Sequence, residues 1–345
     1  MYDFAGLRGL ISDKVNPTNP LMGKLVSFLA DWLNDDIKIL QNTSGSTGPP
    51  KIISIDKQLM LNSARMTGRF FGLKPGMKAL LCLSPEFIGG KMQVVRAMEL
   101  DLDLVITNLE ANPVSGLGQT VDFAAMVPLQ VAHVLKQNPE KFSLIKTLIV
   151  GGGPMPETIE EGLQNVAAVC WHSYAMTETL SHVALRAVNG PHRSNWFAPM
   201  EGVELSTDDR GCLVVSAPAV AQGPVVTNDL VELKGQQFKV LGRIDDVVIS
   251  AGQKFHPAQL EQKLSRVIQT PFFLTGEYQP EAGQILVLYL EGNFKNEEIL
   301  KLKIQIEGLL QINESPRKVV TIAKFKYLES GKIDRLGTIA NNACP

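Results

Sequence analysis

The chain has 345 residues and a formal net charge of −2, from 33 lysines and arginines against 35 aspartates and glutamates. This length predicts roughly two domains, and the near-neutral charge argues against a nucleic-acid or anionic-membrane binder. The four cysteines lie far apart in the sequence, which excludes a zinc ribbon or a disulfide scaffold. The N-terminus shows no secretory signal, and no apolar run approaches the roughly 18 residues of a membrane span. We therefore expect a cytoplasmic protein without a membrane span.

The first elements are a helix, a strand and a second helix. The first helix is expected over residues 21–34, and a strand follows at Ile37–Leu40. The apolar face of that helix carries Leu21, Leu25, Phe28, Leu29 and Leu33. The second helix begins after Asp56 as its N-cap and stops at Gly72.

Later apolar runs are short enough to be buried strands. They are Ala79–Leu83, Leu102–Ile106, Leu144–Val150 and Val166–Trp171. Helical stretches near residues 90–100, 128–138 and 156–164 separate them. Because parallel strands need such crossovers, this alternation predicts an α/β fold with a mostly parallel sheet flanked by helices.

The pattern changes from about residue 200. Short β-like runs between glycines and polar turns predict an antiparallel module, with strands at Cys212–Ser216, Val225–Thr227, Leu230–Leu233 and Phe238–Leu241. The remaining chain predicts α+β structure: a helix opened by Pro257, a strand at Ile285–Leu290, a helix around residues 299–309 and a strand at Val319–Tyr327. We expect a large body over residues 1–244 and a small mobile domain over 245–345.

Hydroxyl-bearing residues and glycines crowd the segment Thr43–Lys51. Such a segment exposes backbone N–H groups and side-chain donors, and with a closing lysine it can bind a polyphosphate. It is not a Walker A loop, because two prolines separate Gly48 from Lys51 and Ile52 follows. Taken alone, the pattern leaves a solvated turn open as the alternative.

Four further segments join this one in the order of a known superfamily. Together the five segments are Thr43–Lys51, Tyr174–Thr179, Asp229 in Thr-Asn-Asp-Leu, Gly242–Lys254 and Gly331-Lys332. They resemble the motifs of the acyl-adenylate-forming (AMP-binding) superfamily, which includes acyl-CoA synthetases, adenylation domains and luciferases. Ala175 and Ala251 stand where those motifs usually have glycine, and Thr-Asn-Asp stands in place of Thr-Gly-Asp.

The resemblance implies an ATP-dependent acid–CoA ligase that joins a carboxylate to the α-phosphate of ATP and expels pyrophosphate. Thr177 would donate to the α-phosphate, and Glu178 would hold Mg²⁺, a hard cation suited to oxygen ligands. Lys332 would bridge the attacking carboxylate and the α-phosphate. The β- and γ-phosphates would be gripped by Thr43, Ser44, Gly45, Ser46, Thr47, Gly48 and Lys51.

The same resemblance assigns the nucleoside and the moving domain. Tyr174 would stack on adenine beside the loop containing Gly152, while Asp229 and Arg243 would bind the ribose hydroxyls. Asp245 matches the hinge position about which the small domain would swing. One pose would bring in Lys332 for adenylation. The other would present the loop around Gly252 to CoA, where the methyl of Ala251 adds bulk.

Three further segments look most like O-succinylbenzoate–CoA ligases, particularly compact bacterial forms: Ser84–Met92, Met126–Gln130 and Tyr174–Ser181. That acid has a second carboxylate that does not react, so a cation should face it. Lys91, His182 and Arg186 are candidates by their position near the motifs. The competing interpretation is that the two cations extend from helices into water and that His182 lies on a helix surface.

Relatives usually carry more than a hundred residues before the phosphate loop, which here begins at Thr43. One interpretation is a minimal enzyme whose acyl pocket is built by the central sheet, with or without a second subunit of a homodimer. Alternatives are another aryl- or acyl-CoA synthetase, a stand-alone carrier-loading adenylation enzyme, and a non-catalytic nucleotide-binding protein. Retention of the motif residues from Lys51 to Lys332 favours an enzyme, because a nucleotide sensor would not need the C-terminal lysine.

Overall fold

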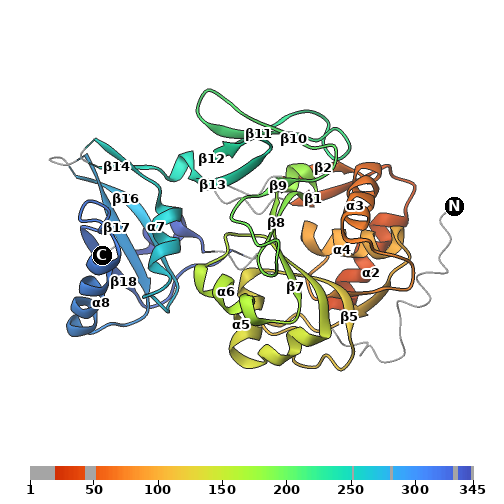
Figure 1. Cartoon of the computed structure of the whole chain (residues 1–345), viewed down its shortest axis with the longest axis horizontal. Coiled ribbons are helices and arrows are strands. Elements are labelled where there is room, and N and C mark those ends of the chain that lie inside the picture. The colour runs from red at the N-terminus through yellow and green to blue at the C-terminus, as the bar shows by residue number, and fades with distance from the viewer. Residues whose placement is uncertain (1–19, 43–51, 251, 280–282, 329–332, 343–345) are drawn as a thin grey trace.

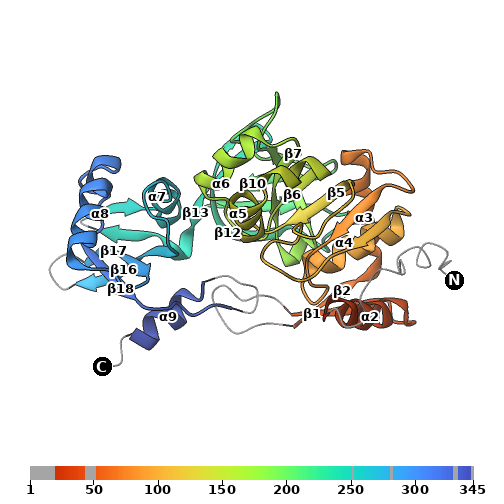
Figure 2. The same cartoon turned by 90° about the horizontal axis from the view of Figure 1, so that it is seen from below.

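The computed structural model describes residues 20–42, 52–250, 252–279, 283–328 and 333–342. The molecule is elongated, with a body built around a large sheet at one end and a smaller C-terminal unit at the other (Figure 1). A β-rich module lies along the upper side of the body in Figure 1 and largely behind the body in Figure 2. Within the described ranges, no helix combines the length and apolar character needed to cross a bilayer.

A seven-stranded sheet forms the centre of the body, in the order β4-β3-β5-β6-β7-β8-β9. Its strands are β3 (Lys78–Leu81), β4 (Asp103–Ile106), β5 (Val121–Met126), β6 (Ile145–Val150), β7 (Val169–Ala175), β8 (His182–Ala187) and β9 (Ala198–Pro199). The first five in spatial order are parallel, and β8 and β9 are antiparallel additions. The predicted α/β class with a mostly parallel sheet is confirmed. Strands β5 and β8 escaped prediction.

Helices cover both faces of this sheet. They are α2 (Pro20–Leu33), α3 (Lys57–Phe71), α4 (Ile88–Glu99), α5 (Pro128–Gln137) and α6 (Glu157–Gly162), with short 3₁₀ turns η1 (Pro139–Leu144) and η2 (Leu163–Asn165). Side chains of β3 and of the residue after it alternate between two apolar cores. Ala79 and Leu81 pack in the core that contains α3 and α4, whereas Leu80 and the following Cys82 pack in the core that contains α5 and α6. This alternation makes the sheet a middle layer.

The predicted helix ends of α3 are confirmed. The side chain of Asp56 accepts a hydrogen bond from the Gln58 backbone N–H at 2.8 Å, and Gly72 adopts a left-handed φ of 62°. One detail of α2 was wrong: Trp32 is buried in the core, whereas Leu33 is 38% exposed. The periodicity therefore located the helix but misplaced the last residue of its buried face.

Two antiparallel sheets complete the described part of the chain before η4 (Ile244–Asp246). A hairpin pairs β1 (Lys38–Asn42) with β2 (Ile52–Asp56). The β-rich module is a four-stranded sheet of β10 (Glu204–Thr207), β11 (Cys212–Ser216), β12 (Val225–Lys234) and β13 (Gln237–Arg243). The predicted antiparallel module is confirmed, but two of its expected strands are one strand, β12, with a register shift between Leu230 and Val231.

The C-terminal unit has its own sheet and its own apolar cores. Its elements are β14 (Val248–Ser250), β15 (Gln253–Phe255), α7 (Pro257–Leu264), β16 (Phe272–Gln279), β17 (Gly283–Glu291), α8 (Asn296–Leu309), β18 (Lys318–Ile322) and α9 (Arg335–Asn342). The predicted α+β character is confirmed, although the last strand ends at Ile322 rather than Tyr327. A 3₁₀ turn, η4 (Ile244–Asp246), joins β13 to β14.

Candidate active site

The carboxyl end of β7 carries the Tyr-Ala-Met-Thr-Glu-Thr segment. After Ala175 the chain turns through η3 (Thr177–Thr179) and returns as β8. The buried Thr179 hydroxyl donates to the backbone carbonyls of Met176 and Ser181 at 3.2 and 2.9 Å, and Leu180 adopts a left-handed φ of 66°. The turn is therefore held rigidly from inside, at the sheet edge where parallel α/β sheets bind ligands.

The turn exposes two of the predicted catalytic side chains. Glu178 is exposed and Thr177 is half-buried. Among residues that the structure describes, none donates a hydrogen bond to the Glu178 carboxylate. Ala175 is exposed, with no positive φ, so its methyl group meets neither a packing nor a backbone obstacle.

Three predicted nucleoside-binding residues meet in space although they come from distant segments. Tyr174 donates its hydroxyl to Asp229 at 2.5 Å, and Asp229 on β12 pairs across the sheet with Arg243 on β13. Arg243 Nη1 lies 3.6 Å from Asp229 Oδ1, and Nη2 lies 2.9 Å from Asp245 Oδ2. Burial and then the Asp229 charge raise the pKa of Tyr174, which keeps the phenol a neutral donor.

Tyr174 is held in place by aromatic side chains. Its ring packs edge-on against Phe238, with centroids 5.0 Å apart, and against Phe197 at 6.1 Å. Phe197 and Phe238 stack on each other and also join β9 to the β-rich module through backbone hydrogen bonds. The ring is thus set at the junction of the central sheet and the module that carries Asp229 and Arg243.

A glycine loop follows β6 next to this cluster. The Gly151 N–H donates to the Met126 carbonyl at 3.0 Å, and a Cβ at Gly151 would lie 2.3 Å from Ser173 Oγ. Gly152 has a φ of 84°, which favours glycine. The backbone therefore runs close to β7, where a bound nucleotide would also approach it.

Several predicted site residues lie outside the described ranges: the phosphate-loop residues Thr43–Lys51, Ala251 and Lys332. The turn carrying Gly252 is described only in part. It follows β14, which pairs with β17 at Ser250 and Gly283 and runs away from the body in Figure 1.

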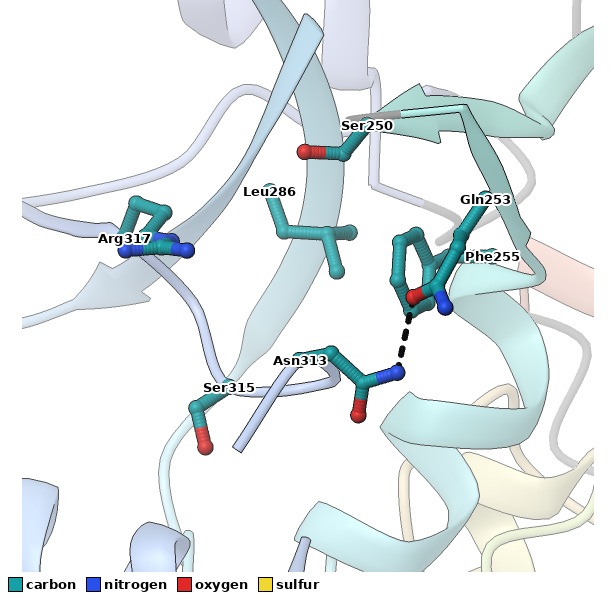
Figure 3. A pocket seen from close by; sticks show the side chains of 7 residues that line it. All are labelled: Ser250, Gln253, Phe255, Leu286, Asn313, Ser315 and Arg317. Carbon is teal, nitrogen blue, oxygen red and sulfur yellow. Dashed lines mark hydrogen bonds between the residues drawn. The ribbon is translucent and has the colours of Figure 1, made fainter. Parts of the chain in front are cut away.

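A small cavity lies in the same region of the C-terminal unit (Figure 3). It measures about 40 Å³ and is lined by Ser250, Gln253, Phe255, Leu286, Asn313, Ser315 and Arg317. Asn313 Nδ2 donates to Gln253 Oε1 across its floor at 2.8 Å. This volume suits one or two water molecules and is too small for a nucleotide or an aromatic acid.

A family model for AMP-binding enzymes matches residues 15–223, more than half of the chain. The chain belongs to the AMP-binding enzyme family. The sequence-based prediction of an enzyme of this family is therefore confirmed.

Solved structures and curated proteins agree with this membership. An acyl-CoA synthetase (AMP-forming)/AMP-acid ligase II-like protein from Dyadobacter fermentans is 35% identical, with 95% of this chain and 96% of that chain covered and a TM-score of 0.62. O-succinylbenzoate coenzyme A synthetase from Bacillus subtilis, in complex with ATP and magnesium ion, shares the fold at 21% identity, with a TM-score of 0.73 over 87% of this chain and 69% of that chain. A probable 2-succinylbenzoate–CoA ligase from Mycobacterium tuberculosis is 23% identical over 341 residues, covering 90% of this chain and 86% of the relative.

In this AMP-binding enzyme, the three candidate cations for the acid are all buried. Lys91 on α4 donates to Gln41 Oε1 at 2.8 Å and to the Leu40 carbonyl at 3.3 Å. Arg186 pairs with Glu160, with Nη2 and Oε2 2.6 Å apart. The helix interpretation of His182 and Arg186 was wrong, because both lie on the buried strand β8.

A fourth cation, Arg96 on α4, escaped prediction. It is 3% exposed, and within the described ranges no carboxylate pairs with it. Its guanidinium donates to Ser181 Oγ at 2.5 Å and to Thr67 Oγ1 at 3.2 Å, and burial lowers its pKa to about 10. His182 completes this cluster with an imidazole held neutral by burial and by the Arg96 charge, both of which lower its pKa. The sequence signal was an arginine within the apolar stretch of α4.

Proposed function

We propose that this AMP-binding enzyme is an ATP-dependent acid–CoA ligase that works through an acyl-adenylate. The convergence of Tyr174, Asp229 and Arg243 from three separate strands carries the proposal. An aromatic ring beside a carboxylate and a guanidinium suits adenine stacking and ribose hydrogen bonding. The named relatives, described as acid–CoA ligases, support the same reaction.

The first half-reaction forms the acyl-adenylate. A carboxylate oxygen of the acid attacks the α-phosphorus, the bond to the bridging oxygen of the β-phosphate breaks, and pyrophosphate leaves with both electrons of that bond. Thr177 donates to the α-phosphate, Lys332 bridges the two anions, and Thr43–Lys51 bind the β- and γ-phosphates. These contacts place positive charge and donors where negative charge develops.

A divalent cation fits this site only together with the substrate. In the described part of the chain, no three His, Cys, Asp or Glu side chains gather to hold a metal by themselves. The exposed Glu178 carboxylate would bind Mg²⁺ jointly with phosphate oxygens, a ligand set that this hard cation prefers. Magnesium would neutralise phosphate charge as the bond breaks.

The second half-reaction transfers the acyl group to CoA. We propose that residues 245–345 swing about Asp245, which withdraws Lys332 and brings the turn around Gly252 to the adenylate. The thiolate sulfur of CoA then attacks the acyl carbon and AMP leaves. Domain closure about a few residues at an element boundary is an established mode of switching.

For the acid, we propose 2-succinylbenzoate in menaquinone biosynthesis, the substrate in the names of several relatives. Lys91, His182 and Arg186 remain candidates for its second carboxylate. Arg186 already has Glu160 as counter-ion, whereas Arg96 and Lys91 are hydrogen-bonded only to neutral groups within the described residues. Arg96 is the stronger candidate of these two, because it is the more deeply buried, at 3% exposed against 8%. A buried cation without a carboxylate gains most from an anionic ligand. The cytoplasmic location stays a prediction from the sequence.

ATP–pyrophosphate exchange over a panel of aromatic and keto acids tests the reaction, followed by CoA addition and mass identification of the product. We expect acid-dependent exchange and an acyl-CoA product. Lys332→Ala should abolish adenylate formation and spare thioester formation from supplied acyl-adenylate. Nucleotide binding with no acid-dependent exchange would identify a non-catalytic protein, and adenylate without acyl-CoA would favour a carrier-loading enzyme.

The substrate assignment has its own test. Arg96→Gln keeps hydrogen-bonding capacity toward Ser181 but removes the charge. We expect its KM for 2-succinylbenzoate to rise at least about tenfold, the loss of one charged hydrogen bond, with the KM for benzoate almost unchanged. Lys136→Ala, at an exposed lysine on α5, is the control and should affect both acids alike. Lys91→Ala tests the competing candidate, and a loss confined to 2-succinylbenzoate there would assign the contact to Lys91. Equal losses on both acids in Arg96→Gln would refute the contact.

A further inference from the structure

The hinge position is tied to the nucleoside cluster by an asparagine. Asn228 lies on β12 between Thr227 and Asp229, where the superfamily motif has glycine. Its side-chain amide Nδ2 donates to both oxygens of Asp245, at 3.0 Å to Oδ2 and 3.3 Å to Oδ1. Glycine has no side chain to make this contact. We call the two hydrogen bonds from Asn228 to Asp245 the tether.

The orientation of this amide is fixed by its other end. Arg210 Nη1 donates to Asn228 Oδ1 at 3.1 Å, and Nη2 donates to the Thr227 carbonyl at 3.0 Å. Asp208 accepts from Arg210 Nε at 2.8 Å and holds the guanidinium in place. Since a guanidinium can only donate, the Asn228 oxygen must face Arg210 and the nitrogen must face Asp245.

The Asp245 carboxylate therefore accepts hydrogen bonds from residues on two strands. Arg243 on β13 donates to Asp245 Oδ2 at 2.9 Å, and Asn228 on β12 donates from the other side. Arg243 also faces Asp229, which accepts from Tyr174. One chain of polar contacts therefore runs from the adenine-stacking ring to the residue at the hinge.

We infer that Asn228 is a positioning residue that holds Asp245 in the present pose and so sets the balance between the two half-reactions. The inference rests on the proposed function, in which the C-terminal unit swings about Asp245. In the pose described, strand β14, which leads into the Gly252 turn, runs away from the body (Figure 1), so the tether opposes the pose that thioester formation needs. Nucleotide binding at Asp229 and Arg243 would act on the same chain of contacts.

Asn228→Ala removes the tether and leaves Asp229 and Arg243 in place. The two half-reactions are measured separately, as single-turnover adenylate formation and as thioester formation from supplied acyl-adenylate. We expect adenylate formation to fall about three- to tenfold, the scale of an ordinary hydrogen bond, and thioester formation not to fall. Asn62→Ala is the matched control, because Asn62 donates to the Ala219 carbonyl at 2.9 Å, far from the hinge.

Asn228→Asp is the second variant. It keeps the side-chain size and the acceptor for Arg210 but turns the donor toward Asp245 into a second carboxylate. The shift should have the same direction as in Asn228→Ala and be at least as large. Equal changes in both half-reactions, or no change in folded variants, would overturn the inference.

A distance measurement keeps the inference testable if the wild-type protein forms no adenylate, which would refute the proposed function instead. Spin labels at exposed Lys136→Cys on α5 and Lys301→Cys on α8, in a Cys344→Ser background, report the separation of body and C-terminal unit. We expect Asn228→Ala to broaden the distance distribution relative to Asn62→Ala. An unchanged distribution would overturn the role of Asn228 in holding the hinge.

Discussion

Behind the glycine loop, a buried ion pair and a neutral imidazole fix the position of the Gly153 carbonyl. Arg186 donates to both Glu160 oxygens, at 2.6 and 3.1 Å, and through Nε to His172 Nδ1 at 3.3 Å. Because Nδ1 accepts, the imidazole proton is on Nε2, which donates to the Gly153 carbonyl at 3.3 Å. Burial disfavours the charged Glu160 carboxylate, but the hydrogen bonds and charge of Arg186 outweigh it and lower the pKa.

Glu160→Gln should be strongly destabilising, because it leaves the Arg186 guanidinium buried without a counter-ion. We expect the free energy of unfolding to fall by about 3–5 kcal/mol, measured by urea denaturation at pH 7. The double variant Glu160→Gln/Arg186→Met removes both charges and should lose less than the single variant. A single variant as stable as the double one would contradict this account of the pair.

The buried histidines should make the protein acid-sensitive. Burial, and next the Arg186 charge, lower the pKa of His172 to about 4. The unfolded imidazole titrates near 6.5, so between pH 6.5 and 4 the unfolded state binds more protons. Stability is therefore fully present above about pH 6.5 and is lost as the pH falls toward 4, by on the order of 3 kcal/mol at most.

His172→Gln removes that titration, so the urea midpoint should depend less on pH between 6.5 and 4.5 than it does in the wild-type protein. His133→Gln on α5 is the matched control, because this half-buried histidine makes no hydrogen bond to Arg186 or Glu160. The same pH dependence in His172→Gln and in the control would exclude His172 as a source of the acid sensitivity.

At the scale of single elements, apolar periodicity predicted helices and parallel strands well and strand β8 poorly. All six residues of β8 are buried, yet His182 and Arg186 are four apart, a spacing typical of a helix face. Their partners are Thr67 and Glu160, from distant segments, so the sequence alone could not show that these polar groups are satisfied inside. Arg96 was missed for the same reason.

The candidate nucleoside-binding residues follow more directly from sequence motifs than the candidate acid-binding residues do. Tyr174, Asp229 and Arg243 belong to motifs with fixed neighbours in the sequence, and the structure brings them together. A contact to the acid depends instead on which buried cation lacks a partner. That property appears only after distant strands and helices have packed.

The glycine loop after β6 gives a sharp element-scale test. Gly151→Ala would place a methyl group 2.3 Å from Ser173 Oγ, so we expect a loss of about 1–3 kcal/mol in stability and weaker ATP binding. Ser173→Ala removes that oxygen and should partly rescue Gly151→Ala. Gly153→Ala is the control, because a Cβ there meets nothing within 4 Å. Thermal unfolding and ATP titration measure both effects, and a Gly151→Ala protein that behaves like Gly153→Ala would refute the close approach.

On the scale of the whole molecule, the C-terminal unit touches the body through few polar contacts. Arg266, beyond α7, pairs with Glu157 at the start of α6, with Nε and Oε2 2.7 Å apart. Glu157 and Glu160 lie on the same helix, α6, and each makes an ion pair: Glu157 with Arg266 and Glu160 with Arg186. The C-terminal unit therefore contacts α6, the helix whose Glu160 positions the Gly153 carbonyl through Arg186 and His172.

The Glu157–Arg266 ion pair should affect the position of the C-terminal unit relative to the body, and should contribute little to the free energy of unfolding. The side chains of Arg266 and Glu157 are 50% and 27% exposed, so a double-mutant cycle with Arg266→Gln and Glu157→Gln should give less than about 1 kcal/mol for unfolding. The spin-label distance distribution should broaden in both single variants and in high salt. A distance distribution that changes neither in the single variants nor in high salt would mean that the Glu157–Arg266 ion pair does not hold the C-terminal unit in place.

The strand order of the central sheet also bears on the order in which the protein folds. Parallel neighbours pair residues far apart in the chain, such as Lys78 with Asp103 and Val121 with Ile145, whereas the β7–β8 hairpin pairs Ala175 with His182. Loop closure costs less entropy for the shorter separation. We therefore expect the turn that presents Thr177 and Glu178 to form early in folding, and the long crossovers to assemble around it.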